Sequence, residues 1–225
     1  MIIAIDGPSG AGKSTVAKAV AKQLGFACLD TGAMYRSVAW KALQEGISFD
    51  DEEACTHIAR TEPIEFFTNP GEVLPSKVSI GGTDVTQAIR TAEIDKAVSP
   101  VSALPGVRLA LVEQQQRIGR AGNYVVEGRD IGTVVFPDAE VKVFLTASPE
   151  ERAHRRVRQN ADRGFGSIDY DEVLADIIRR DKVDSSRDTS PLRPAEDSVQ
   201  IDSTASYIEE VITRICKMAR EKMDS

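Results

Sequence analysis

The sequence predicts an α/β fold in which a five-stranded parallel sheet carries helices on both faces. Short apolar runs alternate with stretches of helical periodicity along most of the chain, which is the pattern of repeated strand–helix units. The run at residues 141–145 is mostly apolar, as expected for a strand that is covered on both faces. A glycine-rich octet also separates the first apolar run from the first helical stretch.

The expected core strands are residues 2–6, 27–29, 124–127, 141–145 and 199–201. The first helix is expected at residues 13–24, because Val16, Val20 and Leu24 recur every four residues and form one face. The last helix shows a similar apolar stripe, which we interpret as core packing, at Ile208, Val211, Ile212, Ile215 and Ala219.

Residues 62–86 break this alternation. They contain three short β-like runs separated by the turn signals Asn-Pro-Gly and Gly-Gly, so we expect a small antiparallel insert there. The chain is expected to form a single domain over residues 1–225. Its core comprises residues 1–61 and 87–225, and the insert lies between them.

The glycine-rich octet at residues 7–14 reads GPSGAGKS and fits the phosphate-binding pattern G-x-x-x-x-G-K-[ST]. Such an octet arises by accident in roughly one chain in a hundred of this length. The alternative is a glycine-rich turn that binds nothing, but the octet follows a strand and opens a helix. In a phosphate loop, Lys13 reaches the β- and γ-phosphates and Ser14 offers its hydroxyl to Mg²⁺. Further magnesium contacts stay open, with Asp6 and Glu127 as outer candidates.

The composition indicates which partners and which cellular compartment to expect. A formal net charge of −7 argues against binding to a nucleic acid polymer. Three widely spaced cysteines without a C-x-x-C pair predict neither a disulfide framework nor a zinc site, and favour a reducing cytoplasm. We find no signal peptide and no apolar run long enough for a membrane span, and we expect a monomer.

Charged side chains follow the predicted strands at the edge where ligands bind in parallel sheets. Arg129 and Asp130 come directly after the strand at residues 124–127, and Tyr35 and Arg36 follow the strand at residues 27–29. Gathered arginines predict a site that neutralises more than one phosphate group. The arginine-rich stretch at residues 152–163 has a plainer alternative, a solvated helix face.

The phosphate loop alone admits kinases, ATPases and GTPases. The guanine-reading pattern N-K-x-D is absent from the sequence, which argues against a GTPase. Two rivals remain: a kinase for another small acceptor such as UMP, AMP or shikimate, and a module that uses nucleotide only as a switch.

Four stretches together resemble the bacterial cytidylate kinases over essentially the full chain. They are residues 5–14 (IDGPSGAGKS), 30–36 (DTGAMYR), 127–139 (EGRDIGTVVFPDA) and 151–156 (ERAHRR). The resemblance implies the phosphate-loop fold of nucleoside monophosphate kinases, with a lid at about residues 152–168 and an acceptor-side insert at about 62–86. The implied reaction is the transfer of a phosphoryl group from ATP, with Mg²⁺, to CMP or dCMP.

The resemblance also implies roles for individual residues. ATP is expected to contact Gly7, Pro8, Ser9, Gly10, Ala11, Gly12, Lys13, Ser14 and Thr15, with Arg156 against the adenine. Further lid contacts to the ATP phosphates are open among Arg152, Arg155 and Arg163. The CMP phosphate is expected at Arg36, Arg129 and Arg187, the cytosine at Ser99, Arg108 and Asp130 with Thr31 and Tyr35 nearby, and the ribose at Arg180 and Asp184. The expected catalytic residues are Lys13, Arg129, Arg156 and Arg187.

Overall fold

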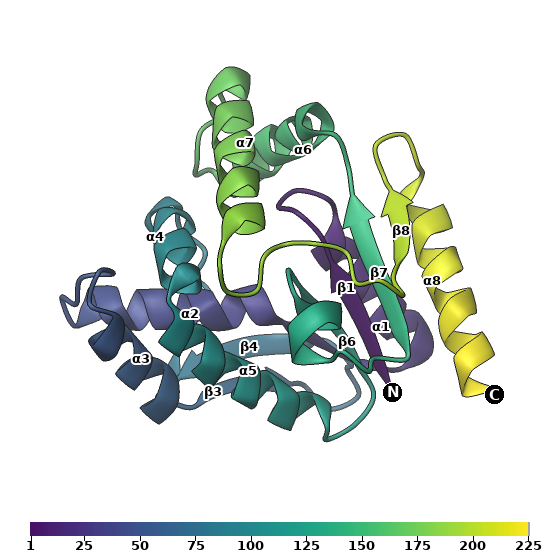
Figure 1. Cartoon of the computed structure of the whole chain (residues 1–225), viewed down its shortest axis with the longest axis horizontal. Helices are drawn as coiled ribbons and strands as arrows, with labels where there is room; N and C mark the ends of the chain where they lie inside the picture. Colours follow the sequence, from purple (N-terminus) through teal and green to yellow (C-terminus); the bar gives the residue numbers. More distant parts are fainter. Residues whose placement is uncertain (225) are drawn as a thin grey trace. The chain divides into compact units, whose positions relative to one another are not determined.

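The central feature of the fold is a five-stranded parallel sheet in the order β2-β6-β1-β7-β8 (Figure 1). The computed structural model describes residues 1–224. The strands of this sheet are β1 (Ile2–Asp6), β2 (Ala27–Asp30), β6 (Tyr124–Gly128), β7 (Val141–Thr146) and β8 (Val199–Asp202). β1 pairs in parallel with β6 on one side and with β7 on the other, so the chain that leaves β1 starts from the middle of the sheet.

The chain divides into two compact units, Met1–Leu29 with Gly122–Ser225 and Asp30–Ala121. In the first unit, helix α1 (Lys13–Leu24) packs on β6 and helix α8 (Ile208–Met223) on β7, and the two helices contact each other. The apolar stripes predicted for both helices face this contact region, since Val16, Val20 and Ile215 are buried. α1 ends where Gly25 adopts the left-handed conformation at φ 70°, which favours glycine.

Two neighbouring helices, α6 (Pro149–Arg163) and α7 (Tyr170–Ser186), lie beyond the end of β7 in the same unit (Figure 1). The Ser148 side chain caps the start of α6 by accepting a hydrogen bond from the Glu151 N–H. Ala153 of α6 packs against Val173 and Ile177 of α7 in a small apolar cluster. A short π-helical turn, η1 (Ile131–Val135), follows β6 and contacts β1 and β6.

The second unit contains helices around a three-stranded antiparallel sheet in the order β3-β4-β5. Its elements are α2 (Thr31–Gln44), α3 (Glu52–Thr61), β3 (Ile64–Thr68), β4 (Pro75–Ile80), β5 (Thr83–Asp84), α4 (Ala92–Ala103) and α5 (Pro105–Gly119). α2 packs on α3, α4 and β4, and its first turn is capped by the Asp30 carboxylate, which accepts from the Ala33 N–H.

The predicted fold class is confirmed: a five-stranded parallel sheet with helices, together with a separate small antiparallel sheet. β1 has the predicted bounds, and the other four core strands each extend one residue beyond them. The functional boundaries assigned to the insert (62–86) and the lid (152–168) stay predictions. Among the helices of the described residues, none is long and apolar enough to cross a membrane.

Candidate active site

The loop between β1 and α1 is shaped by a close approach of backbone to backbone. Gly7 has φ +147°, and a Cβ atom on it would lie 1.9 Å from the Leu145 carbonyl oxygen of β7, so a side chain cannot fit there. α1 begins after Gly12 at φ 93°, and no side chain caps its first turn. The N–H groups of that turn therefore remain suited to bind an anion.

Lys13 is buried and folds back onto its own loop, where its ammonium donates to the Pro8 carbonyl oxygen at 2.8 Å. Burial of the ammonium, together with repulsion from Arg129, lowers the pKa of Lys13 to about 7, although Glu127, Asp6 and Asp184 act in the opposite direction. The charge on this side chain is thus easily changed near neutral pH, and a nearby phosphate would favour the charged form.

A second contact joins the start of α1 to the end of β6. The Ser14 hydroxyl donates to Glu127 Oε2 at 2.7 Å. Glu127 is buried, whereas Ser14 is exposed, so an ion could reach the pair from the loop side. A hydroxyl and a carboxylate are hard oxygen donors of the kind that Mg²⁺ takes beside nucleotide phosphates, and this pair fits that ion.

The first arginine of α6 is not on a solvated face, in contrast to the alternative considered from the sequence. The Arg152 side chain is 3% exposed and forms a two-pronged ion pair with Asp181 of α7, at 3.0 and 2.5 Å. It also donates to the carbonyl oxygens of Ser9 and Ala147. Arg152 therefore ties α6 and α7 to the phosphate loop, whereas Arg158 on the same helix is exposed.

Arg155 supports the loop from another direction. Its guanidinium donates to the Ser203 carbonyl oxygen at 2.6 Å and reaches the Ala11 carbonyl oxygen at 3.5 Å. The Ser203 hydroxyl lies within hydrogen-bonding distance of the same Ala11 oxygen, at 3.2 Å. Glu151 also accepts a hydrogen bond from Arg155, so the guanidinium of Arg155 is oriented by contacts with other residues of the chain.

Arg156, which was predicted to contact ATP, lies beside the loop. Its guanidinium contacts the Ser9 hydroxyl at 3.4 Å and the Gln159 side chain at 3.0 Å. Arg180 of α7 is close enough to interact electrostatically with Arg156. Burial, followed by repulsion from Arg129 and Arg156, lowers the pKa of Arg180 to about 10. These positive charges lie on the same edge of the unit as the phosphate loop.

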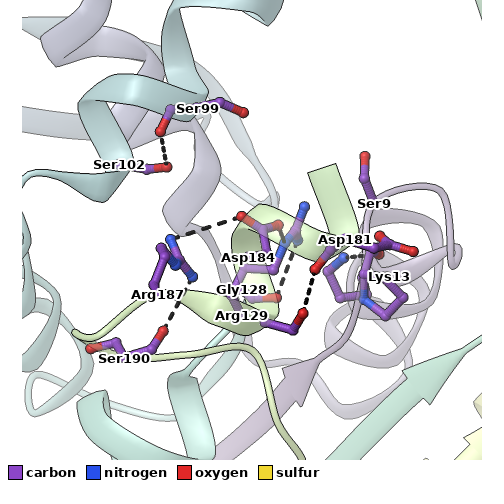
Figure 2. Close-up of polar contacts among 12 residues, drawn as sticks. Ser9, Lys13, Ser99, Ser102, Gly128, Arg129, Asp181, Asp184, Arg187 and Ser190 are labelled. Atoms are coloured by element: carbon purple, nitrogen blue, oxygen red, sulfur yellow. Dashed lines mark hydrogen bonds and ion pairs between the residues drawn. The ribbon is translucent and has the colours of Figure 1, made fainter. Parts of the chain in front are cut away.

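Asp184 lies between two of the arginines predicted to bind the acceptor phosphate (Figure 2). Its carboxylate accepts from Arg129 Nε at 3.0 Å and pairs with Arg187 at 3.9 Å. Arg187 also donates to the Ser190 carbonyl oxygen at 3.2 Å. Burial works to raise the pKa of Asp184, but Arg129 and Arg187 outweigh it and hold the pKa below its usual range. Asp184 is therefore ionised at neutral pH and balances part of the arginine charge.

Asp130 is buried just after β6 in the first unit, and the remaining predicted acceptor residues lie in the second unit. Arg36 of α2 forms an ion pair with Asp95 of α4. The Arg108 guanidinium stacks 5.5 Å from the centre of the Tyr35 ring and donates to the Ser102 carbonyl oxygen. Within this unit the Arg36 contact thus joins α2 to α4, and the Arg108 contacts join α5 to α2 and α4. Ser99 accepts from Ser102 through its carbonyl oxygen, and Thr31 is buried at the start of α2.

The family model for cytidylate kinase matches residues 3–221 of the chain. The chain belongs to the cytidylate kinase family. The resemblance drawn from the four sequence stretches is therefore confirmed.

Curated members of the cytidylate kinase family align over almost the whole chain. A cytidylate kinase of Bacillus subtilis is 48% identical over 220 residues, covering 98% of this chain and 96% of its own length. One from Carboxydothermus hydrogenoformans is 47% identical and covers 100% of this chain and 99% of its own. A bifunctional pantoate ligase/cytidylate kinase of Synechococcus is 50% identical, but the match spans only 41% of that longer protein.

The solved structures add support for the fold alone. A shikimate kinase from Bacteroides thetaiotaomicron superposes with a TM-score of 0.51 at 14% identity, covering 98% of each chain. At this identity the similarity carries no information about the acceptor. It does agree with the arrangement of parallel strands and helices described above.

Several residues that shape this cytidylate kinase family site were not marked by the sequence. Asp181, Ser203 and Asp95 hold the arginines described above, but each stands in a stretch without a recognisable motif. A sequence signal that could have indicated Asp181 is an acidic residue on the helix that follows the arginine-rich helix α6. Nothing in the sequence indicates Ser203, which meets the loop across 192 residues of chain.

Proposed function

We propose that this chain transfers the γ-phosphoryl group of ATP to the phosphate of CMP or dCMP, forming ADP and CDP or dCDP. The observation that carries the proposal lies within one unit. The phosphate loop with Lys13 follows β1, and a separate arginine cluster joins Arg129, directly after β6, to Asp184 and Arg187 at the end of α7. A loop for one polyphosphate and a cluster for a second anion are what a phosphoryl transfer between two nucleotides requires. The family match supports cytosine nucleotides as the acceptors.

On the donor side, the loop from Gly7 to Thr15 would surround the ATP phosphates with N–H groups. Lys13 would leave Pro8 and contact the β- and γ-phosphates. Arg156 would lie against the adenine. Ser14 and Glu127 would hold Mg²⁺, which when bound neutralises charge on the transferring phosphoryl group.

On the acceptor side, Arg36, Arg129 and Arg187 would bind the monophosphate of CMP. In the ligand-free protein two of these arginines pair with Asp184 and the third with Asp95, so a phosphate would compete for guanidinium groups that are already charged and oriented. Arg180 and Asp184 would contact the ribose. Ser99, Arg108 and Asp130 would read the cytosine edge, with Thr31 and Tyr35 beside them.

The proposed reaction requires the two nucleotides to be aligned for transfer, and it does not require a strong base. The attacking phosphate oxygen of CMP is already anionic near neutral pH, so no residue has to remove a proton from it. Two polyanions at close range repel by several kcal/mol in a partly dry site, and the arginines and Lys13 offset that repulsion. Lys13, Arg129, Arg156 and Arg187 are therefore the proposed catalytic residues.

Buried thiols at all three cysteines fit a reducing compartment, and we place the protein in the cytoplasm as a monomer. Light scattering on the purified protein measures the oligomeric state directly.

The deciding experiment supplies ATP and Mg²⁺ with CMP, dCMP, UMP, AMP, GMP or shikimate, and measures ADP release above an acceptor-free background. We expect strong turnover with CMP and dCMP alone. Preference for another acceptor would overturn the roles of Ser99, Arg108 and Asp130. Absence of turnover with every acceptor would favour a nucleotide switch.

A further inference from the structure

The last residue of β1, Asp6, has a buried carboxylate that is hydrogen-bonded to a distant turn. Asp6 Oδ1 accepts from the Ile131 N–H at 2.8 Å, and Oδ2 accepts from the Gly132 N–H at 2.7 Å. The side chain thereby satisfies two N–H groups at the start of η1 across 125 and 126 residues of sequence. Asp130, the residue that begins this turn, makes no capping bond with its own side chain.

The position of Asp6 in the sheet places this contact between the phosphate loop and the turn that follows β6. Asp6 is the register partner of Gly128, so β1 and β6 end side by side. From that point β1 continues into the phosphate loop, and β6 continues into Arg129 and Asp130. One carboxylate therefore lies where the proposed donor loop and the proposed acceptor turn diverge.

The turn is closely packed around this contact. A Cβ atom on Gly132 would lie 3.5 Å from Asp6 Oδ2 and 3.2 Å from Lys142 Cδ, so the turn approaches both side chains closely. Lys142 is itself fixed, because its ammonium donates to the Asp197 carboxylate. The approach leaves the turn little room to shift while the Asp6 bonds are in place.

Burial raises the pKa of Asp6 to about 6, against the effect of the Gly132 and Ile131 N–H groups; Asp130 adds to the rise and Lys13 opposes it. A carboxylate in such surroundings is destabilising unless it is hydrogen-bonded, which makes its two bonds to the turn strong determinants of local structure.

We propose that Asp6 is a positioning residue for the acceptor: it fixes the turn that carries Arg129 and Asp130 relative to the phosphate loop. The inference rests on the proposed function, since it assigns these two residues to CMP. Asp6 itself touches neither nucleotide in this proposal. Its loss would let the turn move, so that acceptor binding and base selection suffer more than ATP binding.

The test uses Asp6→Asn, which replaces one acceptor oxygen by an amide donor facing an N–H group. Gly132→Ala serves as a second variant that displaces the same turn without changing charge, because its methyl group would press on Lys142 Cδ at 3.2 Å. Asp51→Asn is the control, because Asp51 also accepts a backbone N–H at a helix start, at 3.0 Å, in the other unit. Hydrogen exchange at the Ile131 and Gly132 amides, measured by NMR without ligand, reports the bonds themselves. Steady-state kinetics report KM for CMP, KM for ATP and the preference for CMP over UMP.

We expect the first two variants to lose about tenfold or more of the amide protection and to raise KM for CMP about tenfold, with KM for ATP changed less than about threefold. The preference for CMP should fall in parallel, and Asp51→Asn should change none of these quantities. Loss of protection with unchanged acceptor kinetics would reduce Asp6 to a purely structural role and overturn the proposal. An equal rise in both KM values would also overturn the proposal, because the effect of Asp6 would then not be specific to the acceptor.

Gly132→Ala decides the question if Asp6→Asn does not fold. Absence of CMP turnover in the unmodified protein would defeat the proposed function. In that event the amide exchange and the calorimetric affinity for CMP would still decide whether Asp6 holds an acceptor turn.

Discussion

The Ser14 hydroxyl donates a 2.7 Å hydrogen bond to the Glu127 carboxylate, joining the first turn of α1 to the end of β6. Two oxygen ligands suited to magnesium are thus fixed relative to each other before any nucleotide binds. If the pair holds Mg²⁺ as proposed, the metal dependence of the proposed reaction should be sensitive to the Glu127 carboxylate.

Glu127→Gln is expected to raise the Mg²⁺ concentration needed for half-maximal activity and to lower kcat, each by about 10- to 100-fold. The amide keeps the shape of the side chain but lacks the negative charge that favours the ion. Initial rates against free Mg²⁺ at saturating ATP and CMP measure the effect. Glu150→Gln, at an exposed position on α6, is the control. An unchanged Mg²⁺ dependence would exclude Glu127 from the metal site.

Lys13→Ala is expected to lower kcat by about 10³-fold or more with the fold retained, because Lys13 is the one basic residue of the octet at residues 7–14. Circular dichroism verifies the fold, and coupled ADP release measures the rate. Lys18→Ala, on the exposed face of the same helix, should be nearly silent. Substantial residual turnover in Lys13→Ala would refute the proposed role.

ATP binding is expected to take up a proton at pH 8. The pKa of Lys13 is lowered to about 7 in the ligand-free protein, so the side chain is mostly neutral there, and the ATP phosphates would favour its charged form. Calorimetric titrations in buffers of different ionisation enthalpy should show an uptake of up to about one proton. The uptake should disappear in Lys13→Met, and equal heats in all buffers would contradict the expectation.

Asp130→Ala is expected to reduce the preference for CMP over UMP, by a factor of up to about 10⁴. The carboxylate would accept from the cytosine amino group, whereas uracil presents an acceptor at that position. The ratio of kcat/KM for the two nucleotides measures the preference. Asp138→Ala, at an exposed position in the same motif, is the matched control. Discrimination as strong as in the unmodified protein would count against the assignment.

Asp181→Asn is expected to destabilise the fold by about 1–3 kcal/mol, since the buried Arg152 guanidinium loses its charged partner. Urea unfolding measures the free energy of unfolding. Asp176→Asn, which removes a largely exposed partner of Arg179, should change it by less than about 1 kcal/mol. Equal effects of the two substitutions would show that the Arg152 pair is no stronger than a surface ion pair.

The elements of the fold were predictable because each carries a local signal. The octet at residues 7–14 predicts the strand before it and the helix after it. Turn residues such as Gly81 and Gly82 predict the antiparallel insert. Contacts between distant residues carry no such signal. The sequence placed Asp6 only among candidate outer contacts of Mg²⁺, whereas its carboxylate binds the Ile131 and Gly132 amides.

The arginines illustrate the same difference within one helix. Periodicity and charge alone do not separate Arg152, which is buried against Asp181, from Arg158, which faces solvent. The separation depends on where α7 packs, and that packing is set by apolar contacts such as Ala153 with Ile177. The sequence therefore predicted where the arginines of this helix lie along the chain. Only the tertiary structure shows which of them pair with other residues of the protein and which face solvent.

The position of β1 in the middle of its sheet has a consequence for synthesis of the protein. β1 is made before its neighbours β6 and β7, which begin at Tyr124 and Val141, so the strand has no partner while the intervening chain is translated. At translation rates of about 5–20 residues per second that interval lasts on the order of 10 s. The phosphate loop also depends on Asp181 and Ser203, which follow later still. A nascent chain therefore lacks these supports of the phosphate loop until Ser203 has left the ribosome, and the apolar β1 segment stays unpaired until β6 and β7 follow.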